Sequence, residues 1–407
     1  MSINYIFMEK ALEIAFSKLG KTSPNPPVGA VITRNNEIIS CGGTSPYGSD
    51  HAEVVAIKNA KIDLQNAELY VSLEPCSHHG KTPPCTDAII QSKIKKVYIP
   101  ILDPNPIVAG KGIKTLKKAG VDVTIVNEMS HYAADLIRPF KKFILNQKPY
   151  IIHKSAITLD GRIATTEGDS KWISSDYSRY IVHRLRSHID AIIIGKNTFS
   201  IDNPTLNIRL DSFSAEVKQF FQQSSSQLKG MDNFFLKMLL NPIISEEESS
   251  PLRIIIGLPD EFNLTNNIFF DENFLFFIEE KKKDSLLKIK NQTNLEKLIH
   301  DDKITFIRGN TKIEQISDIM NNLFKLGKMF IMLEGGASLA GSFYESGEID
   351  QFLYFISPKI IGKGIAPIEG KGVRTIKESL ILHDISIISI KKDLLYNAYK
   401  EKYNFNV

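Results

Sequence analysis

Apolar residues recur at intervals of three and four between positions 4 and 19, and Gly20 then ends the run. This spacing places them on one face of a helix, and a glycine is typical just past a helix end. Two apolar runs, at 28–33 and 37–40, flank Asn35-Asn36, a dipeptide that tolerates the positive φ angles of a tight turn. The pattern predicts a helix followed by a β-hairpin.

The first half of the chain continues by alternating apolar runs with helix-like stretches. The expected strands lie at 68–73, 96–102 and 121–126, and the expected helices at 51–60, 86–92, 111–119 and 130–145. Such alternation is typical of an α/β layer. The helical periodicity breaks at Asn146–Pro149. We therefore place a domain boundary between residues 147 and 148.

The second half shows the same rhythm without repeating the motifs of the first. The expected strands are 150–156, 191–194, 253–256, 305–307, 329–333 and 351–356. A stretch at about 211–250 is rich in Gln, Ser and Phe, and we interpret it as an insertion on the surface of a domain spanning 148–407. Because it contains apolar residues such as Phe234 and Leu239, a lid or an oligomer contact is the alternative.

The length and net charge of the chain restrict the classes of protein to which it can belong. A chain of 407 residues exceeds the usual size of a single core, which favours two domains. Fifty Lys and Arg against 46 Asp and Glu leave a formal charge of +4, far short of a nucleic-acid binder's basic stripe. No apolar run approaches the roughly 18 residues of a membrane span, and the first twenty residues resemble no targeting signal. We expect a cytoplasmic protein with neither a nucleic-acid nor a membrane partner.

Histidine and cysteine residues form the first group of candidate functional residues. His51 is followed by Glu53, and Cys76 and Cys85 come after the next expected strand. One imidazole and two thiolates are three ligands for a tetrahedral zinc ion with an open fourth position, which indicates a catalytic site. Glu53 lies two residues from a ligand, where a carboxylate can transfer protons without binding the metal.

His-x-Glu followed by Pro-Cys is typical of zinc-dependent nucleobase deaminases. The usual spacing of the two cysteines is Cys-x-x-Cys, whereas eight residues separate Cys76 from Cys85. This departure argues against a plain cytidine or tRNA deaminase. A structural zinc site would instead need a fourth protein ligand, for which His78, His79 and Cys41 are the candidates.

The second half carries a different set of motifs. Thr158–Gly161 ends an expected strand in a tight turn, and the segments 168–174 and 202–206 follow. The strand at 329–333 leads into Glu334-Gly335-Gly336 at the start of a helix, where bare backbone N–H groups favour a phosphate. The classical Gly-x-Gly-x-x-Gly fingerprint is absent, so this motif alone is weak.

Together these motifs resemble one family, the bifunctional pyrimidine deaminase/reductase of riboflavin biosynthesis. The segments that carry the resemblance are Pro24–Gly29, His51–Glu53, Leu73–Cys85, Asp103–Gly112, Thr158–Gly161, Gly168–Ser174, Asp202–Pro204 and Glu334–Gly336. They span nearly the whole chain, and the long loop between the cysteines is usual in this family.

The resemblance implies an α/β fold throughout, with a cytidine-deaminase-like α/β/α domain followed by a dihydrofolate-reductase-like α/β domain. It implies zinc on His51, Cys76 and Cys85, with Glu53 as the catalytic proton shuttle. The first reaction would deaminate 2,5-diamino-6-ribosylamino-4(3H)-pyrimidinone 5′-phosphate. NADPH would then reduce the ribosyl side chain to ribityl. The implied partners are this small phosphorylated pyrimidine and, as a homo-oligomer, further copies of the chain.

The same resemblance implies binding residues for both sites. In the deaminase they are Asn25 and Lys81. Around the nicotinamide cofactor they are Ala156, Trp172, Thr198, Asp202 and Gly336. Around the reductase substrate they are Ser170, Arg186, Leu206, Arg209 and Glu334. Gly257 and Leu258 depart from the family, which commonly has a polar pair near the cofactor there, so contacts at this point are in doubt.

Two other classes of function remain open from the sequence. One is a nucleic-acid or nucleoside deaminase fused to a reductase-like module, which would show salt-sensitive binding to RNA or DNA. The other is a non-enzymatic protein with a structural zinc ion and a nucleotide-binding or assembly module.

Overall fold

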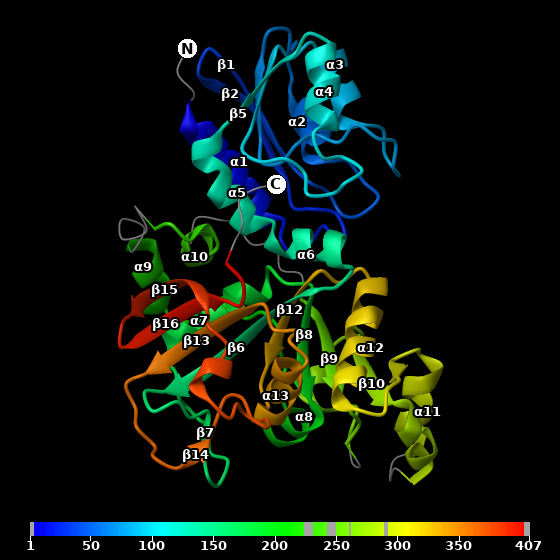
Figure 1. The fold of residues 1–407 in the computed structure, drawn as a ribbon, viewed down its shortest axis with the longest axis vertical. Coiled ribbons are helices and arrows are strands. Elements are labelled where there is room, and N and C mark those ends of the chain that lie inside the picture. Colours follow the sequence, from blue (N-terminus) through cyan, green and yellow to red (C-terminus); the bar gives the residue numbers. More distant parts are fainter. Residues whose placement is uncertain (1–3, 224–230, 242–249, 260–261, 289–291, 403–407) are drawn as a thin grey trace. The chain divides into compact units, whose positions relative to one another are not determined.

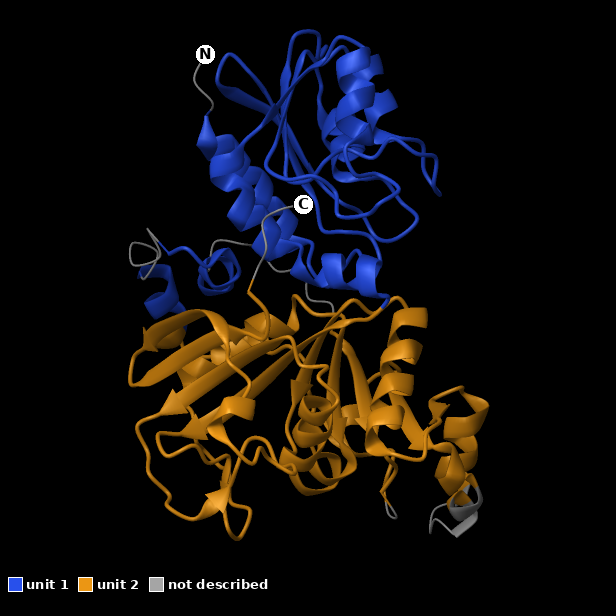
Figure 2. Cartoon of the chain, in the orientation of Figure 1, with its two compact units in different colours: residues 1–147, 218–247, 403–407 blue, residues 148–217, 248–402 orange. Residues whose placement is uncertain are grey.

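The computed structural model describes residues 4–223, 231–241, 250–259, 262–288 and 292–402. These residues form two compact units (Figure 2). The first unit is built from the described parts of 1–147 and 218–247, and the second from those of 148–217 and 248–402.

The first unit contains a five-stranded sheet in the order β2-β1-β3-β4-β5 (Figure 1). Strand β1 is antiparallel to β2 and β3, and the β3-β4 and β4-β5 pairs are parallel. Its elements up to residue 147 are α1 (Tyr5–Ser17), β1 (Gly29–Arg34), β2 (Glu37–Gly43), α2 (Ala52–Asn59), β3 (Glu68–Val71), α3 (Cys85–Gln91), β4 (Lys96–Ile99), α4 (Lys111–Lys118), β5 (Asp122–Ile125), η1 (Asn127–Met129), α5 (Ser130–Leu136) and α6 (Arg138–Asn146).

Two glycines let helices approach the β1-β2 hairpin from opposite faces. A Cβ atom on Gly29 would lie 2.0 Å from the carbonyl oxygen of Ala11 in α1, and one on Gly42 would lie 2.4 Å from that of Ala52 in α2. Gly29 pairs with Gly43, so its neighbour Gly42 faces the other side of the pleated sheet. Helices therefore cover both faces, which confirms the expected three-layer architecture.

The helices and strands expected for this unit are confirmed, except that one expected helix is divided in two. Asn35 and Asn36 have φ angles of 53° and 63°, as the turn requires. The helix expected at 130–145 is divided into α5 and α6 at Ile137, whose ψ of 8° leaves the helical range. Pro139 then lies in the first turn of α6, where a proline needs no N–H partner.

The second unit contains a nine-stranded sheet in the order β11-β10-β9-β8-β12-β6-β13-β16-β15. Neighbouring strands from β11 to β13 are parallel, whereas β16 is antiparallel to β13 and β15. The strands of the unit are β6 (Tyr150–Thr158), β7 (Ala164–Thr165), β8 (Ala191–Gly195), β9 (Leu252–Ile256), β10 (Phe274–Glu279), β11 (Ile304–Ile307), β12 (Phe330–Glu334), β13 (Gln351–Ser357), β14 (Gly364–Ile365), β15 (His383–Ile390) and β16 (Asp393–Tyr399).

Helices cover this sheet as in other α/β domains. They are α7 (Asp176–Arg186), α8 (Lys196–Asp202), η2 (Leu210–Ser212), η4 (Asn267–Phe269), η5 (Glu280–Lys288), α11 (Gln292–His300), α12 (Lys312–Lys325), α13 (Ala337–Glu345) and η6 (Ile376–Glu378). The six predicted strands are confirmed, whereas β7, β10, β14, β15 and β16 were not predicted. Across the described residues, no helix is both long and apolar enough to cross a membrane.

The segment interpreted as a surface insertion contains a helix with a buried apolar face. Its described part comprises α9 (Ala215–Gln223) and α10 (Phe234–Leu240), and α10 packs against α1 and α5 of the first unit. The Phe235 ring lies 6.1 Å from that of Phe16, and its backbone N–H donates to Asp135 at 2.9 Å. A surface excursion is therefore the wrong interpretation of α10, which is part of the core.

Truncating the buried face of α10 should destabilise the first unit. Phe235→Ala and Leu239→Ala each remove a side chain that is at most 5% exposed, so each should cost about 3 kcal/mol. Calorimetry of the full chain should show the first unit unfolding at a lower temperature. Gln219→Ala, an exposed position on α9, is the matched control and should have no effect. An unchanged transition in Leu239→Ala would contradict the packing role of α10.

Candidate active sites

The three predicted zinc ligands meet at the ends of two helices in the first unit. His51 is the N-cap residue of α2, Cys85 is the first residue of α3, and Cys76 follows β3. The Nδ1 atom of His51 lies 3.5 Å from the sulfur of Cys76 and 3.3 Å from that of Cys85. All three ligand atoms lie within 4.8 Å of one another. One imidazole and two thiolates at this spacing fit a zinc ion.

Hydrogen bonds around the two thiols favour a thiolate. The side chain of Cys85 and then the imidazole of His51 lower the pKa of Cys76, against the effect of its burial. The backbone N–H of Cys85 also donates to the sulfur of Cys76 at 3.4 Å. This is the protonation state that metal binding requires.

Glu53 lies in the first turn of α2, beside the ligands but outside their cluster. Its side chain is buried, and burial, with the nearby Cys76 thiolate, raises its pKa to about 7. A carboxyl group with this pKa can both accept and donate a proton near neutral pH.

A cavity of about 370 Å³ opens beside this cluster. Asn25 and Lys81, the two binding residues expected in the deaminase, line it together with His51, Glu53 and Cys76. The Lys81 ammonium also lies 4.1 Å from the centre of the Tyr47 ring, which supports a cation–π contact. The structure thus brings together every residue that the sequence proposed for this site.

The sequence analysis assigned no role to several other polar residues of this cavity, among them Glu74, Asp103 and Asn105. Asp103 is buried, its pKa is raised to about 7 mainly by that burial, and it accepts the backbone N–H of Asn105 at 2.7 Å. The motif that contains Asp103 and Asn105, Asp103–Gly112, was recognised, but no role was assigned within it. A short polar segment directly after a buried strand was the available signal.

The candidates for a fourth protein ligand are not part of the cluster. Among the described residues, the group of possible ligands at this site has only the three members already named. His78 and His79 have exposed side chains, and Cys41 lies in β2. The arrangement matches a catalytic site more closely than a structural one.

A second cavity, of about 650 Å³, lies in the second unit at the carboxyl ends of β8, β9 and β10. Thr198 and Gly336, two of the expected cofactor residues, line it, whereas Ala156, Trp172 and Asp202 do not. A Cβ on Gly335 would lie 3.0 Å from the Thr198 methyl carbon, so glycine permits this close approach. Parallel α/β sheets bind their ligands at this edge.

Gly257 and Leu258, which depart from the family pattern, also line the second cavity. Gly257 has a φ of 82°, which a side chain would strain. Neither residue offers a polar side chain to a cofactor. The polar side chains that line this cavity include those of Lys196, Lys282 and Lys312.

Three largely buried charged side chains, Lys154, Arg186 and Glu334, form an ion triad, and Glu334 directly precedes Gly335 and Gly336. Glu334, at the end of β12, accepts Lys154 of β6 at 2.8 Å and Arg186 of α7 at 3.0 Å. Burial alone would raise the pKa of Glu334, but the two cations hold it well below its ordinary value. Lys154 was missed by the sequence analysis, although a lysine inside an otherwise apolar strand was a signal.

The expected substrate residues of the reductase differ in how accessible they are. Arg186 is buried and also donates to the carbonyl oxygen of Asn207 at 3.0 Å, so its guanidinium is held within the protein. Arg209 has an exposed side chain, and its backbone N–H donates to Nδ1 of the buried His183. Burial lowers the pKa of His183 to about 3, which leaves it neutral as an acceptor. Ser170 is exposed and Leu206 is buried.

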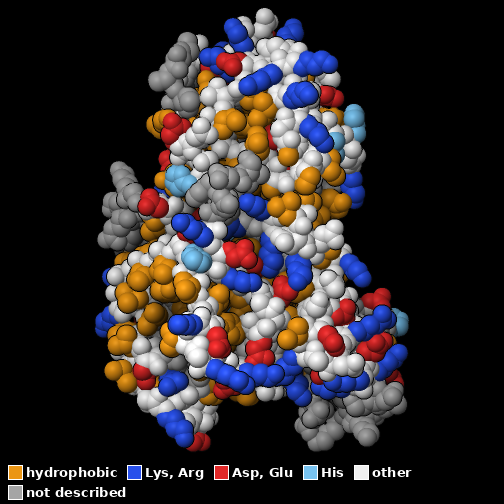
Figure 3. Space-filling view, viewed as in Figure 1, with side chains coloured by type: hydrophobic (Ala, Val, Ile, Leu, Met, Phe, Trp, Pro, Cys, Tyr) orange, Lys and Arg blue, Asp and Glu red, His pale blue; other side chains and the backbone are white. Residues whose placement is uncertain are grey.

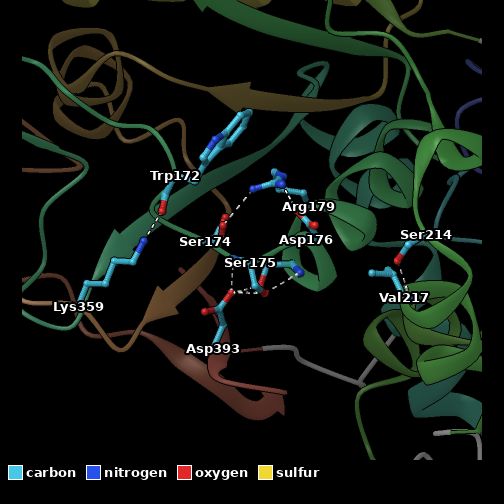
Figure 4. Close-up of polar contacts among 10 residues, drawn as sticks. Trp172, Ser174, Ser175, Asp176, Arg179, Ser214, Val217, Lys359 and Asp393 are labelled. Carbon is cyan, nitrogen blue, oxygen red and sulfur yellow. Dashed lines mark hydrogen bonds and ion pairs between the residues drawn. The ribbon is translucent and has the colours of Figure 1, made fainter.

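The segment carrying Trp172 is held from several sides (Figure 4). The Arg179 guanidinium lies 4.3 Å from the centre of the Trp172 ring and donates to the carbonyl oxygen of Ser174. Ser175 donates through its backbone N–H and hydroxyl to the buried Asp393 at 2.8 and 2.7 Å. The indole itself is 64% exposed, so it presents a large surface to solvent.

Two family models match separate parts of the chain. The cytidine and deoxycytidylate deaminase zinc-binding region matches residues 1–101, and the RibD C-terminal domain matches residues 149–396. The first match contains all three predicted zinc ligands and Glu53. The second contains the ion triad.

Known proteins are also similar to this chain over nearly its whole length, across both matched regions. The chain is 34% identical to riboflavin biosynthesis protein RibD of Aquifex aeolicus, with 96% of each chain covered. It is 35% identical to RibD of Bacillus amyloliquefaciens, with 96% of this chain and 95% of that protein covered. A solved deaminase/reductase of Thermotoga maritima, 28% identical, superimposes with a TM-score of 0.75 and 97% coverage of both chains.

Proposed function

This chain belongs to the RibD family of riboflavin biosynthesis, and from this premise we propose which residues carry out its two reactions. The protein is a zinc-dependent deaminase and an NADPH-dependent reductase. We assign the deaminase to residues 1–147 and the reductase to residues 148–407. The observation that carries the proposal is the cluster of His51, Cys76 and Cys85 beside the buried carboxyl group of Glu53.

For the first reaction, the proposed substrate is the diaminopyrimidine phosphate named above. The solved Thermotoga protein is named as a diaminohydroxyphosphoribosylaminopyrimidine deaminase, which supports this choice. Zinc, when bound, supplies Lewis-acid activation of a water molecule. Glu53 would accept a proton and return it to the leaving amino group, and Asn25 and Lys81 would hold the substrate in the cavity.

For the second reaction, NADPH supplies the hydride that reduces the ribosyl side chain to ribityl. Thr198 and Gly336 line the second cavity beside the start of α13, and we propose that they would hold the cofactor's phosphates. Ala156, Trp172 and Asp202, which do not line this cavity, are the other residues that we propose for cofactor binding. Ser170, Arg186, Leu206, Arg209 and Glu334 form the proposed substrate site. Hydride transfer needs orientation and the exclusion of water, but no protein nucleophile.

The surface is consistent with a small-molecule substrate. Lys and Arg side chains are scattered over the face in Figure 3 and are not gathered into one stripe. A nucleic-acid deaminase would need such a stripe to neutralise phosphates. The cytoplasmic location and the homo-oligomeric state stay predictions.

One experiment tests both activities in the same full-length protein. With the diaminopyrimidine phosphate and NADPH, ammonia release and NADPH oxidation should reach equal amounts. Removing zinc with a chelator should stop ammonia release but leave the reduction of the deaminated intermediate intact. Ammonia release that survives complete zinc removal would contradict the proposal, as would the absence of NADPH oxidation.

A further inference from the structure

We propose that Glu74 is a positioning residue of the deaminase, which holds the wall of the cavity that faces the zinc ligands. This inference rests on the proposed function. Glu74 is buried and precedes Pro75 and Cys76 in the chain. It carries no role in the mechanism above.

The Glu74 carboxylate accepts three backbone N–H groups, two from the loop between β4 and α4 and one from the first turn of α4. Its Oε2 atom accepts Gly110 at 2.9 Å and Asp103 at 3.2 Å, and its Oε1 atom accepts Ile113 at 3.2 Å. Asp103 and Gly110 thus share one oxygen atom. Both lie in the loop between β4 and α4, so Glu74 holds the two ends of the loop segment 103–110 together.

The same contacts cap a helix that has no cap of its own. Gly110 is the N-cap residue of α4, and without a side chain it cannot accept the free N–H groups of the first turn. Glu74 accepts one of these groups, the N–H of Ile113, from 39 residues away, and its negative charge suits the positive end of the helix dipole. A Cβ on Gly112 would lie only 2.0 Å from the carbonyl oxygen of Pro75, so this end of α4 packs directly on the segment before Cys76.

The loop closed by Glu74 carries the cavity wall. Asp103, Asn105 and Val108 all line the cavity that contains His51, Glu53 and Cys76. The wall and the segment that carries Cys76 are therefore joined by the Glu74 side chain, together with the backbone hydrogen bond from Glu74 to Ile101 at 3.2 Å and the packing of Gly112 on Pro75. Without Glu74, the ends of the loop segment 103–110 would no longer be held together. The three predicted zinc ligands would still be positioned by the helices and the strand next to them.

The test uses Glu74→Gln and Glu74→Ala in the full-length protein. Glutamine retains one acceptor oxygen and places an amide donor toward a backbone donor, whereas alanine removes every contact. We expect KM for the diaminopyrimidine phosphate to rise about tenfold in Glu74→Gln and further in Glu74→Ala. The deaminase kcat should stay within about threefold, because Glu53 and the zinc ligands are untouched.

Three measurements separate this role from general damage. Zinc content should remain that of the wild-type protein, and reduction of the deaminated intermediate, at the other site, should be unchanged. Glu68→Gln, in β3 with its carboxylate paired to Lys96, is the matched control and should leave KM unaltered. Gly112→Ala keeps Glu74 but disturbs the packing of α4 against Pro75, and it should also raise KM.

Two outcomes would overturn the proposal. One is a KM within twofold of wild type in both Glu74→Ala and Gly112→Ala. The other is a loss of zinc together with kcat, which would assign Glu74 to the support of the metal ligands instead. Neither outcome would affect the proposed function, which fails only if the wild-type protein lacks one of the two activities.

Discussion

Replacing Glu53 by glutamine should reduce deamination by at least ~10²-fold, while zinc stays bound and reduction of the deaminated intermediate continues. Glutamine has nearly the same size as glutamate but cannot accept and return a proton. Glu53 is buried and lies outside the ligand cluster, so the substitution removes the proton carrier without removing a ligand.

Ammonia release, zinc content and NADPH oxidation from the deaminated intermediate are the three measurements for this variant. Glu37→Gln, an exposed carboxylate in β2 of the same unit, is the control and should behave as wild type. Normal ammonia release from Glu53→Gln would contradict the proton-transfer role. Loss of zinc from the variant would instead show that Glu53 supports metal binding.

Replacing Glu334 by glutamine should impair both the stability of the second unit and its reductase activity. The side chains of Lys154, Arg186 and Glu334 are 13%, 9% and 16% exposed, so the change would leave two cations buried without their counter-charge. Breaking such a pair costs about 3 kcal/mol or more. Reduction of the deaminated intermediate should fall by at least ~10²-fold, because the carboxylate also borders the proposed substrate site.

A double variant separates these two effects. Lys154→Met combined with Glu334→Gln removes one of the unpaired cations, so it should be less destabilised than Glu334→Gln alone, yet remain inactive as a reductase. Deamination should be normal in both variants. Equal stability of Glu334→Gln and wild type in calorimetry would show that the triad contributes nothing to folding.

The pH dependence of stability provides a further check on Glu334. Its folded-state pKa lies below the unfolded value, so the unfolded chain takes up the proton first as the pH falls. Its contribution is therefore present above about pH 4.3 and is lost as the pH falls toward the folded-state pKa. Glu334→Gln should lack this part of the acid dependence.

Acid should also destabilise the second unit through its buried histidines. The pKa values of His153 and His183 are lowered by burial to about 3, while an unfolded histidine titrates near 6.5. Below that value the unfolded chain binds more protons, so stability decreases with falling pH. The Glu334 comparison is therefore made at each pH against the wild-type protein.

Residue types and spacing in the sequence determined the zinc site. An imidazole and two thiolates that occur together most often bind a metal ion. His51 and Glu53 are only two residues apart, so the start of helix α2 alone sets their relative positions. Six of the nine strands of the second sheet were also recognisable, because most of them are buried on both faces and are continuous apolar runs.

The tertiary structure alone decided which distant residues meet. Lys154, Arg186 and Glu334 come together because β12 lies beside β6 in the sheet, and strand order depends on packing that no local pattern records. Glu74 reaches a loop 36 residues away for the same reason. The apolar residues of α10 indicated burial, but the sequence did not show that α1 and α5 form the surface against which they pack. Local side-chain periodicity shows which face of an element is buried, whereas its partner depends on the free energy of the whole fold.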